Sequence, residues 1–336
     1  MTAAIIVMLI ALAAANGAND VSKGVATLAG AGVAAYRTAI LWGAATTLIG
    51  GLLSIQLGRG MGSLFSKGIV DATPSAAFAL SILLATAAWV LLASLLKLPV
   101  STTHAMVGSL VGAGLILAPS AVQWSGVAQK VVLPLLLSIV VAYGISLALG
   151  TAAKLARRRL QPELVPAGAA TAHEAPAAET PRRVDRVITV LHWISSGATG
   201  CARGLNDTPK IAAIGGFALI PAGYSYTTVS LLVVTAMALG SLAGIRVART
   251  LGEKVLKMSH LEGFTANLTT AGLVGSGALL AMPMSTTQVS TGAIVGAAGG
   301  QLSRLSGKTL RDFAIAWLIT PVFGAAVAAT VYWAVR

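Results

Sequence analysis

Two short polar motifs interrupt apolar stretches at widely separated points of the sequence. Residues 19–23 read NDVSK and residues 206–210 read NDTPK. Each motif joins an ammonium group to a carboxylate and an amide, whose oxygens are ligands that a hard cation accepts. An ionisable group at mid-membrane depth is costly and marks a functional site by default. Asp20 and Asp207 are therefore the leading candidates for a buried ion or proton site.

A second pair of motifs carries hydroxyl groups. Residues 99–104 read PVSTTH and residues 283–288 read PMSTTQ. In each, proline ends one helix and Ser or Thr caps the next. The free N–H groups and positive dipole end of that next helix favour an anion, and hydroxyls with helix N-termini suit a tetrahedral oxyanion. The hydroxyls concerned are those of Ser101, Thr102, Thr103, Ser285, Thr286 and Thr287.

Simpler interpretations of these residues stay open. The acidic motifs could be surface loops, and the hydroxyls could be ordinary helix caps. Lys23 and Lys210 follow the acids by one turn and could pair with them or contact the substrate. His104 is replaced by Gln288 in the second hydroxyl motif, so it is either a proton relay or a hydrogen-bonded structural residue. Arg203 could reach the interface or attract an anion.

The elements that must position these motifs are apolar helices. Of 336 residues, 56% are hydrophobic and 10% charged, against roughly 25% charged in ordinary soluble domains. About 20 apolar residues span a bilayer core as a helix. Charge-free runs of 21 to 25 residues lie at 38–58, 72–96, 131–153 and 313–335, and the runs at 211–245 and 263–303 are longer still. The sequence predicts an all-α, polytopic membrane protein, and a net charge of +13 placed mostly at helix ends argues against nucleic-acid binding.

The paired motifs divide the chain into two similar halves. The acidic motifs lie 187 residues apart and the hydroxyl motifs 184 apart, in the same order,. Residues 154–186, between the halves, are rich in Ala, Pro, Glu and Arg and lack hydrophobic periodicity, which is typical of a flexible linker,. We expect a first transmembrane repeat over 1–153, a linker over 154–186, and a second repeat over 187–336.

Each half is expected to hold about five or six helical segments. The ranges are 3–35, 38–58, 75–96, 104–118 and 131–153, then 187–220, 226–245, 263–281, 286–303 and 313–335. The first segment of each half is expected to be interrupted, because Gly17 and Gly204 allow an unwound backbone beside the acids. An odd number of crossings inverts the second repeat, and broken or re-entrant helices at matching central positions are typical of transporters. Re-entrant hairpins would change the number of crossings without changing parity.

Basic residues predict the orientation. If the linker is cytoplasmic, the inner side holds sixteen Lys and Arg residues, whereas the outer loops hold Arg59, Lys67 and Lys130. Cytoplasmic loops carry the excess of basic residues. We therefore expect a multi-pass protein of the cell membrane with a cytoplasmic linker and both termini outside. The basic linker could also bind anionic membrane lipid.

These motifs resemble the duplicated signatures of the inorganic phosphate transporter (PiT) family. The resemblance lies in GANDV, GLND, PVSTTH, PMSTTQ and the MSHLEGFTANLTTAG stretch over 258–272, and it extends over the chain outside the linker. It implies an inverted-repeat transporter, usually a homodimer, that carries phosphate inward with Na⁺ or H⁺. The residues it implicates in the substrate and ion sites are Asn19, Asp20, Ser101, Thr102, Thr103, Asn206, Asp207, Ser285, Thr286 and Thr287.

The chain departs from the family pattern at its lysines. The common signature continues GANDVANA, whereas this chain reads GANDVSKG. Lys23 replaces a small or amide residue near the implied cation site, and Lys210 does so again. A tethered ammonium there could displace Na⁺, which favours proton coupling. Some family members carry sulfate, and these motifs do not separate the two oxyanions.

The sequence as a whole predicts a symporter for inorganic phosphate, driven by a Na⁺ or H⁺ gradient, with alternating access around a midplane anion site. A sulfate or other oxyanion permease is the alternative. An anion channel could use the same helix dipoles but needs no carboxylates. An enzyme would need a nucleophile with a base or a metal cluster, and no DxxxD or HExxH spacing accompanies Asp20 and Asp207. We expect no cofactor, and no metal beyond Na⁺ as the coupling ion.

Overall fold

The first half of the chain forms long helices joined by short turns. The computed structural model describes residues 1–71, 75–160, 183–254, 258–299 and 306–336. The helices of the first half are α1 (Thr2–Asp20), α2 (Ser22–Gly30), α3 (Tyr36–Leu57), α4 (Arg59–Ser63), α5 (Ala76–Leu95), α6 (Thr102–Leu117), α7 (Trp124–Gly126) and α8 (Leu133–Leu160). Short helical turns of other pitch are η1 (Leu64–Gly68), η2 (Pro119–Ala121) and η3 (Val127–Val132).

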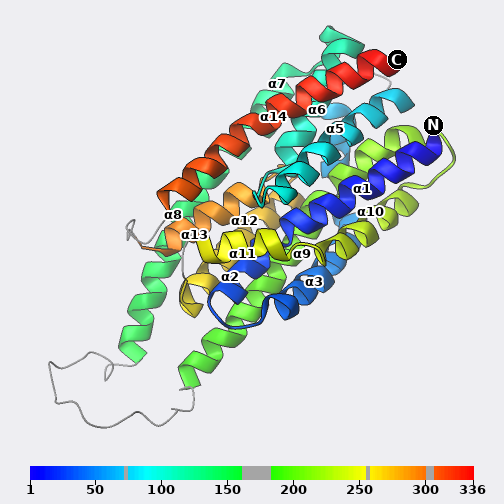
Figure 1. Cartoon of the computed structure of the whole chain (residues 1–336). Helices are drawn as coiled ribbons and strands as arrows, with labels where there is room; N and C mark the ends of the chain where they lie inside the picture. The colour runs from blue at the N-terminus through cyan, green and yellow to red at the C-terminus, as the bar shows by residue number, and fades with distance from the viewer. Residues whose placement is uncertain (72–74, 161–182, 255–257, 300–305) are drawn as a thin grey trace, which may run out of the picture.

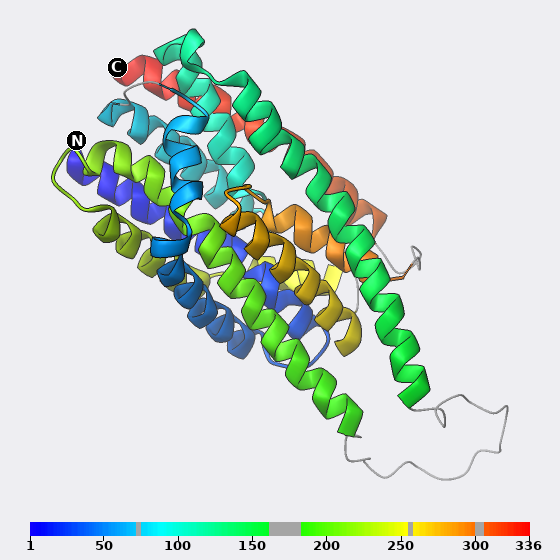
Figure 2. The same cartoon turned by 180° about the vertical axis from the view of Figure 1, so that it is seen from behind.

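The second half is built in the same way. Its helices are α9 (Arg183–Leu219), α10 (Tyr226–Ser241), α11 (Ile245–Lys254), α12 (His260–Leu279), α13 (Thr286–Ala297) and α14 (Gly307–Val335). Figures 1 and 2 show the helices of both halves packed side by side in one elongated bundle. The predicted all-α class is confirmed.

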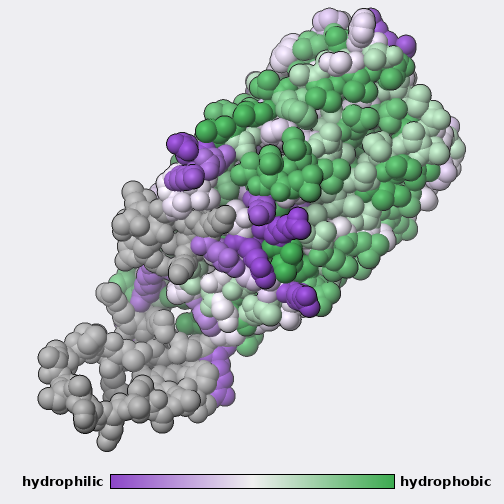
Figure 3. Space-filling view, viewed as in Figure 1, coloured by the Kyte–Doolittle hydropathy of each residue, from purple (hydrophilic) through white to green (hydrophobic). Residues whose placement is uncertain are grey.

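Helices long and apolar enough to cross a membrane dominate the described residues. Five qualify, and a sixth follows if α10 and α11, bent by 62° at their junction, count as one span. The five are Thr2–Gly30, α3, α5, Trp124–Ala156 and α14. Apolar side chains cover the middle of the face seen in Figure 3, and on α14 Leu318 is 74% exposed. A chain that exposes such side chains along its helices is suited to lipid, which confirms the multi-pass prediction.

The segments around the first hydroxyl motif form a hairpin. α5 and α6 pack against each other, and the chain turns between them at Leu96–Ser101. The start of α5 and the end of α6 lie at one end of the bundle, where Val70 pairs with Val122 in an isolated β-bridge. At the same end, the Arg336 guanidinium donates to the Ile116 carbonyl. The hairpin therefore enters from the end that holds the C-terminus.

The segments around the second hydroxyl motif form a hairpin of the opposite sense. Lys154 of α8 lies beside both ends of it, because its Nζ is 3.3 Å from Glu262 Oε1 of α12 and 3.5 Å from the Ala297 carbonyl of α13. Figures 1 and 2 place both chain termini at one end of the bundle and the Leu160 and Arg183 ends of α8 and α9 at the other. The second hairpin enters from that other end.

These hairpins correct the expected number of crossings. The segments expected over 75–96, 104–118, 263–281 and 286–303 pair into two hairpins and are not four independent crossings. A hairpin returns to the end where it began, so the number of membrane crossings in each half falls by two and stays odd. The first half still runs from the end with the termini to the end near Leu160.

A one-residue turn with helical dihedral angles lies within the first acidic motif, whereas the helix of the second motif has no break. Val21 separates α1 from α2 directly after Asp20. The interruption expected in 187–220 is absent, because α9 continues through the second motif with Pro209 inside it. The edges of the expected linker are also helical, at 154–160 and 183–186, and residues 161–182 lie outside the described residues.

Gly17 and Gly204 serve close helix packing and do not unwind the backbone. Both are helical. A Cβ on Gly17 would collide with the Met237 carbonyl of α10, and a Cβ on Gly204 with the Thr47 carbonyl of α3. Small residues of this kind let membrane helices approach closely.

The two hairpin helices pack their glycines against long neighbours in matching ways. Gly108 and Gly112 of α6 face the backbone of α14, and Gly292 and Gly296 of α13 face the backbone of α8. A Cβ on any of the four would meet a carbonyl oxygen of the neighbouring helix within van der Waals distance. Each hairpin helix therefore packs on the last long helix of the other half, α6 on α14 and α13 on α8.

We predict that Gly112→Ala destabilises the protein, because the added methyl would overlap the backbone of Ala325. Overpacking of this kind costs about 1–3 kcal/mol. The measurement is the melting temperature in detergent. Gly272→Ala is the matched control, since a Cβ on Gly272 of α12 meets nothing within 4 Å. An equal loss in both variants would contradict the packing role of Gly112.

Candidate functional site

The tips of the two hairpins meet at the centre of the bundle and bind each other reciprocally. Thr103 Oγ1 donates to the Met284 carbonyl at 3.3 Å, and Thr287 Oγ1 donates to the Val100 carbonyl at 2.6 Å. In each bond, the last threonine of one STT triplet reaches the residue just before the other triplet. The two hydroxyl motifs therefore form one site.

The asparagines of the acidic motifs fix the backbone of these tips. Asn19 Oδ1 accepts from the Val100 N–H at 3.1 Å, and Asn206 Oδ1 accepts from the Met284 N–H at 3.4 Å. Their amide nitrogens donate to the carbonyls of Leu98 at 2.9 Å and Met284 at 3.1 Å. Each acidic motif is thus bonded to the hydroxyl motif of its own half.

Both acids form buried ion pairs with the lysine one turn later. Lys23 Nζ lies 2.7 Å from Asp20 Oδ1, and Lys210 Nζ lies 3.3 Å from Asp207 Oδ1. All four side chains are almost fully buried. Of the two interpretations open for these lysines, the structure therefore shows the ion pair within the protein. The surface-loop interpretation of the acidic motifs is wrong.

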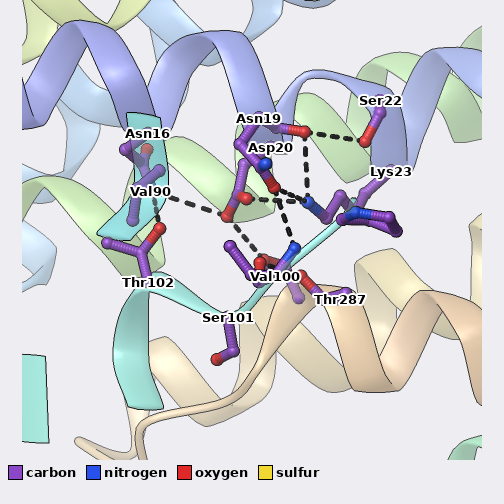
Figure 4. A network of polar contacts seen from close by, with 12 residues as sticks. Asn16, Asn19, Asp20, Ser22, Lys23, Val90, Val100, Ser101, Thr102 and Thr287 are labelled. Atoms are coloured by element: carbon purple, nitrogen blue, oxygen red, sulfur yellow. Dashed lines mark hydrogen bonds and ion pairs between the residues drawn. The ribbon is translucent and has the colours of Figure 1, made fainter. Parts of the chain in front are cut away.

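Asn16 connects the two acids, which makes it a site residue that the sequence did not single out. Its Nδ2 lies 3.4 Å from Asp20 Oδ2 and 3.0 Å from Thr102 Oγ1 (Figure 4). It also lies 3.4 Å from Asp207 Oδ2. Thr286 Oγ1 also donates to Asp20 Oδ2, at 3.0 Å. The available signal was spacing, because residues four apart lie on the same helix face.

Arg203 lies four residues before Asp207, as Asn16 does before Asp20, and it is 1% exposed. It does not extend to an interface. Its guanidinium donates to Thr47 Oγ1, to Ser241 Oγ at 3.1 Å and to the Gly17 carbonyl at 3.4 Å. Arg203 is thus a buried cation held by neutral oxygens next to the acids.

The serines of the hydroxyl motifs cap the two hairpin helices. Ser101 Oγ accepts from the His104 N–H at 3.3 Å, and Ser285 Oγ accepts from the Gln288 N–H at 3.2 Å. In Figure 4 the Ser101 hydroxyl points away from the cluster around Asp20. The predicted caps are confirmed, and the N-terminal ends of α6 and α13, with their remaining N–H groups, both face the centre.

His104 and Gln288 lie away from the polar cluster. Both line a cavity of about 430 Å³ whose other walls include Val131 and Trp317. Within the described part of the chain, His104 Nδ1 and Gln288 Oε1 are buried without a hydrogen-bond partner. The expected hydrogen-bonded role of the His104 ring is therefore not observed.

The charges of the cluster do not cancel. Its buried ionisable side chains are Asp20, Lys23, Arg203, Asp207 and Lys210. With all five ionised, three cations face two anions, and one net positive charge remains. Because ions in a low-dielectric interior interact strongly, an anion that enters this cluster would be attracted.

Comparison with known proteins identifies the family. The model of the phosphate transporter family matches residues 16–328, which include both acidic and both hydroxyl motifs. The chain belongs to the phosphate transporter family. The resemblance seen in the motifs is thereby confirmed.

Relatives match this family member along nearly its whole length. A protein of Rhizobium meliloti (strain 1021), described as a probable low-affinity inorganic phosphate transporter, is 29% identical over 95% of this chain and 92% of its own length. A Bacillus subtilis (strain 168) protein of the same description is 27% identical over 99% and 96%. A solved structure, the sodium-dependent phosphate transporter, has a TM-score of 0.76 at 23% identity and covers 99% of this chain and 98% of that one. The fold of this chain is therefore that of a solved transporter.

We predict that Thr47→Val destabilises this family member. Thr47 Oγ1 accepts from Arg203, and its loss leaves a buried guanidinium N–H without that acceptor. Such a loss costs about 1–3 kcal/mol or more, measurable as a lower melting temperature. Thr270→Val is the control, since the buried Thr270 hydroxyl donates only within its helix, to the Ala266 carbonyl at 2.8 Å. Similar melting temperatures for the two variants would count against the role of Thr47.

Proposed function

We propose that this protein is a symporter that takes up inorganic phosphate, driven by a gradient of Na⁺ or of protons. The observation that carries the proposal is the convergence of two helix N-termini, each with a hydroxyl motif, on a buried cluster of three basic and two acidic side chains. Helix N-termini favour anions. The names of the relatives support phosphate as that anion.

The anion would bind between the hairpin tips. Its oxygens would accept from the N–H groups at the starts of α6 and α13 and from the six hydroxyls of Ser101, Thr102, Thr103, Ser285, Thr286 and Thr287. At present Thr103, Thr286 and Thr287 donate to protein oxygens, and the Ser101 hydroxyl points away from the cluster (Figure 4). Those hydroxyls would turn to the anion on binding, so the reciprocal bonds between the tips would be exchanged for bonds to substrate.

We further propose that the halves are inverted repeats that move relative to each other in alternating access. Support comes from the hairpins, which enter from opposite ends of the bundle. It also comes from the matched bonds of Thr103 and Thr287. Separation of the tips would open the site toward one side of the membrane at a time.

Asp20 and Asp207 would bind the coupling ion or proton, together with Asn19 and Asn206. Two carboxylates that contact the same amide, that of Asn16, form a single electrostatic unit. An ion or proton bound by either acid therefore changes the electrostatic energy of the other acid and of the anion beside them.

The protein would lie in the cell membrane with residues 154–186 in the cytoplasm and both termini outside. The excess of basic residues in the expected inner segments supports this orientation,. The arrangement of the bundle supports it too, since the termini share one end and α8 and α9 extend from the other.

We predict that Asp20→Asn protein that folds and reconstitutes loses driven phosphate accumulation, because the neutral amide cannot take up the coupling charge. The measurement is uptake of radiolabelled phosphate into proteoliposomes, with Na⁺ and pH gradients imposed separately. Asp312→Asn, at a partly exposed acid next to Arg311, is the control and should keep wild-type uptake. Normal accumulation by Asp20→Asn would remove its coupling role.

Competition between anions tests the substrate. Phosphate keeps a proton at neutral pH and can donate it to a carboxylate such as Asp20 or Asp207, whereas sulfate has none to donate. We therefore expect unlabelled phosphate to inhibit labelled phosphate uptake at lower concentrations than sulfate does. Stronger inhibition by sulfate would identify a sulfate permease of the same family.

A further inference from the structure

The Lys23 ammonium lies inside a set of oxygens that would suit a metal cation. Its Nζ is 2.7 Å from Asp20 Oδ1, 2.9 Å from Asn19 Oδ1 and 3.1 Å from the Asn19 carbonyl (Figure 4). One carboxylate, one amide and one backbone carbonyl are the ligand types that hard cations take in proteins. An ammonium has three N–H donors, so these three oxygens satisfy it completely.

The Lys210 ammonium has a matching environment in the other half. Its Nζ is 2.8 Å from Thr103 Oγ1, 3.3 Å from Asp207 Oδ1 and 3.4 Å from the Met284 carbonyl. This set again contains one carboxylate, one neutral side-chain oxygen and one backbone carbonyl. Two lysines in corresponding motifs therefore place their charges at corresponding sites, each next to one acid.

The acids of the cluster are already paired with cations, so no further metal ion is needed to balance their charge. Lys23 and Lys210 already neutralise the two acids, and Arg203 adds a third buried cation. Each added Na⁺ would raise the net positive charge of a site that lies away from water, where uncompensated charge is expensive. An oxyanion would lower it.

We propose that the Lys23 and Lys210 ammonium groups occupy the places of coupling Na⁺ ions, so that this protein transports without Na⁺ and a proton gradient supplies the driving force. The proposal rests on the proposed function as a phosphate symporter. It also implies that the oxygens around each ammonium, including those of Asp20 and Asp207, could bind Na⁺ if the ammonium were removed.

The wild-type protein supplies the first test. Phosphate uptake driven by an imposed pH gradient is measured in proteoliposomes with NaCl and with choline chloride at equal ionic strength. We expect equal rates in the two salts and no uptake driven by a Na⁺ gradient alone. The melting temperature of the wild-type protein in detergent should also be the same in both salts.

The variant Lys23→Ala supplies the second test. Because a ligand that binds only the folded state stabilises it by mass action, the melting temperature of this variant should rise with NaCl and then saturate, relative to choline chloride. The double variant Asp20→Asn/Lys23→Ala lacks the carboxylate and should lose the response. Lys130→Ala, at an exposed lysine of η3, controls for loss of a lysine elsewhere. Lys210→Ala tests the matching site in the same way.

Several results would overturn the proposal. A requirement for Na⁺ in wild-type uptake, or Na⁺-specific stabilisation of the wild type, would do so. So would folded Lys23→Ala and Lys210→Ala variants that both ignore Na⁺. If neither variant folds, the wild-type comparison alone decides. If the wild type moves no phosphate under any gradient, the proposed function fails, and the melting measurements still decide whether the lysines fill cation sites.

Discussion

Five ionisable side chains lie at the centre of a bundle whose outer face is suited to lipid, so the protein itself must supply every partner that these charges need. This constraint accounts for most of the polar contacts in the interior. Lys23 and Lys210 neutralise the acids, neutral oxygens hold Arg203, and the asparagines bond the backbone where the hairpins turn. Buried charges without such partners would cost several kcal/mol each. The polar cluster and the hairpin tips therefore have to form together.

The hairpins provide free backbone N–H groups at mid-depth in the bundle, which helices that cross the whole bilayer do not. A helix that crosses the whole bilayer satisfies its own backbone but leaves no free N–H groups at mid-depth. A helix that begins at mid-depth offers several, and its first turn can face an anion. Such a start is tolerated only inside protein, which explains why α14 and α8 pack so closely along α6 and α13,.

The sequence predicted the class, most helix positions and the residues that meet at the centre. It did so because hydropathy sets membrane helices strongly and because the motifs occur twice. It failed where tertiary contacts decide. α9 stays continuous through Asp207 although Gly204 and Pro209 lie within it, and Gly204 instead lets α9 pack closely on α3. The hairpins were not distinguishable from crossings, because hydropathy reports burial and not the direction in which a segment leaves the membrane. Asn16 was missed because its spacing from Asp20 was not used, and nothing in the sequence indicates its contact with Asp207.

Within the buried cluster, the two halves differ in charge at the corresponding positions Asn16 and Arg203. Both lie four residues before their acid, but one is a neutral amide and the other a cation. In a transporter made of two inverted repeats, exchange of conformation between the halves converts one facing state into the other. With identical halves the two states would have equal energy. A cation on one side only removes that degeneracy, so the difference between Asn16 and Arg203 would contribute to a resting preference of the empty carrier for one face of the membrane.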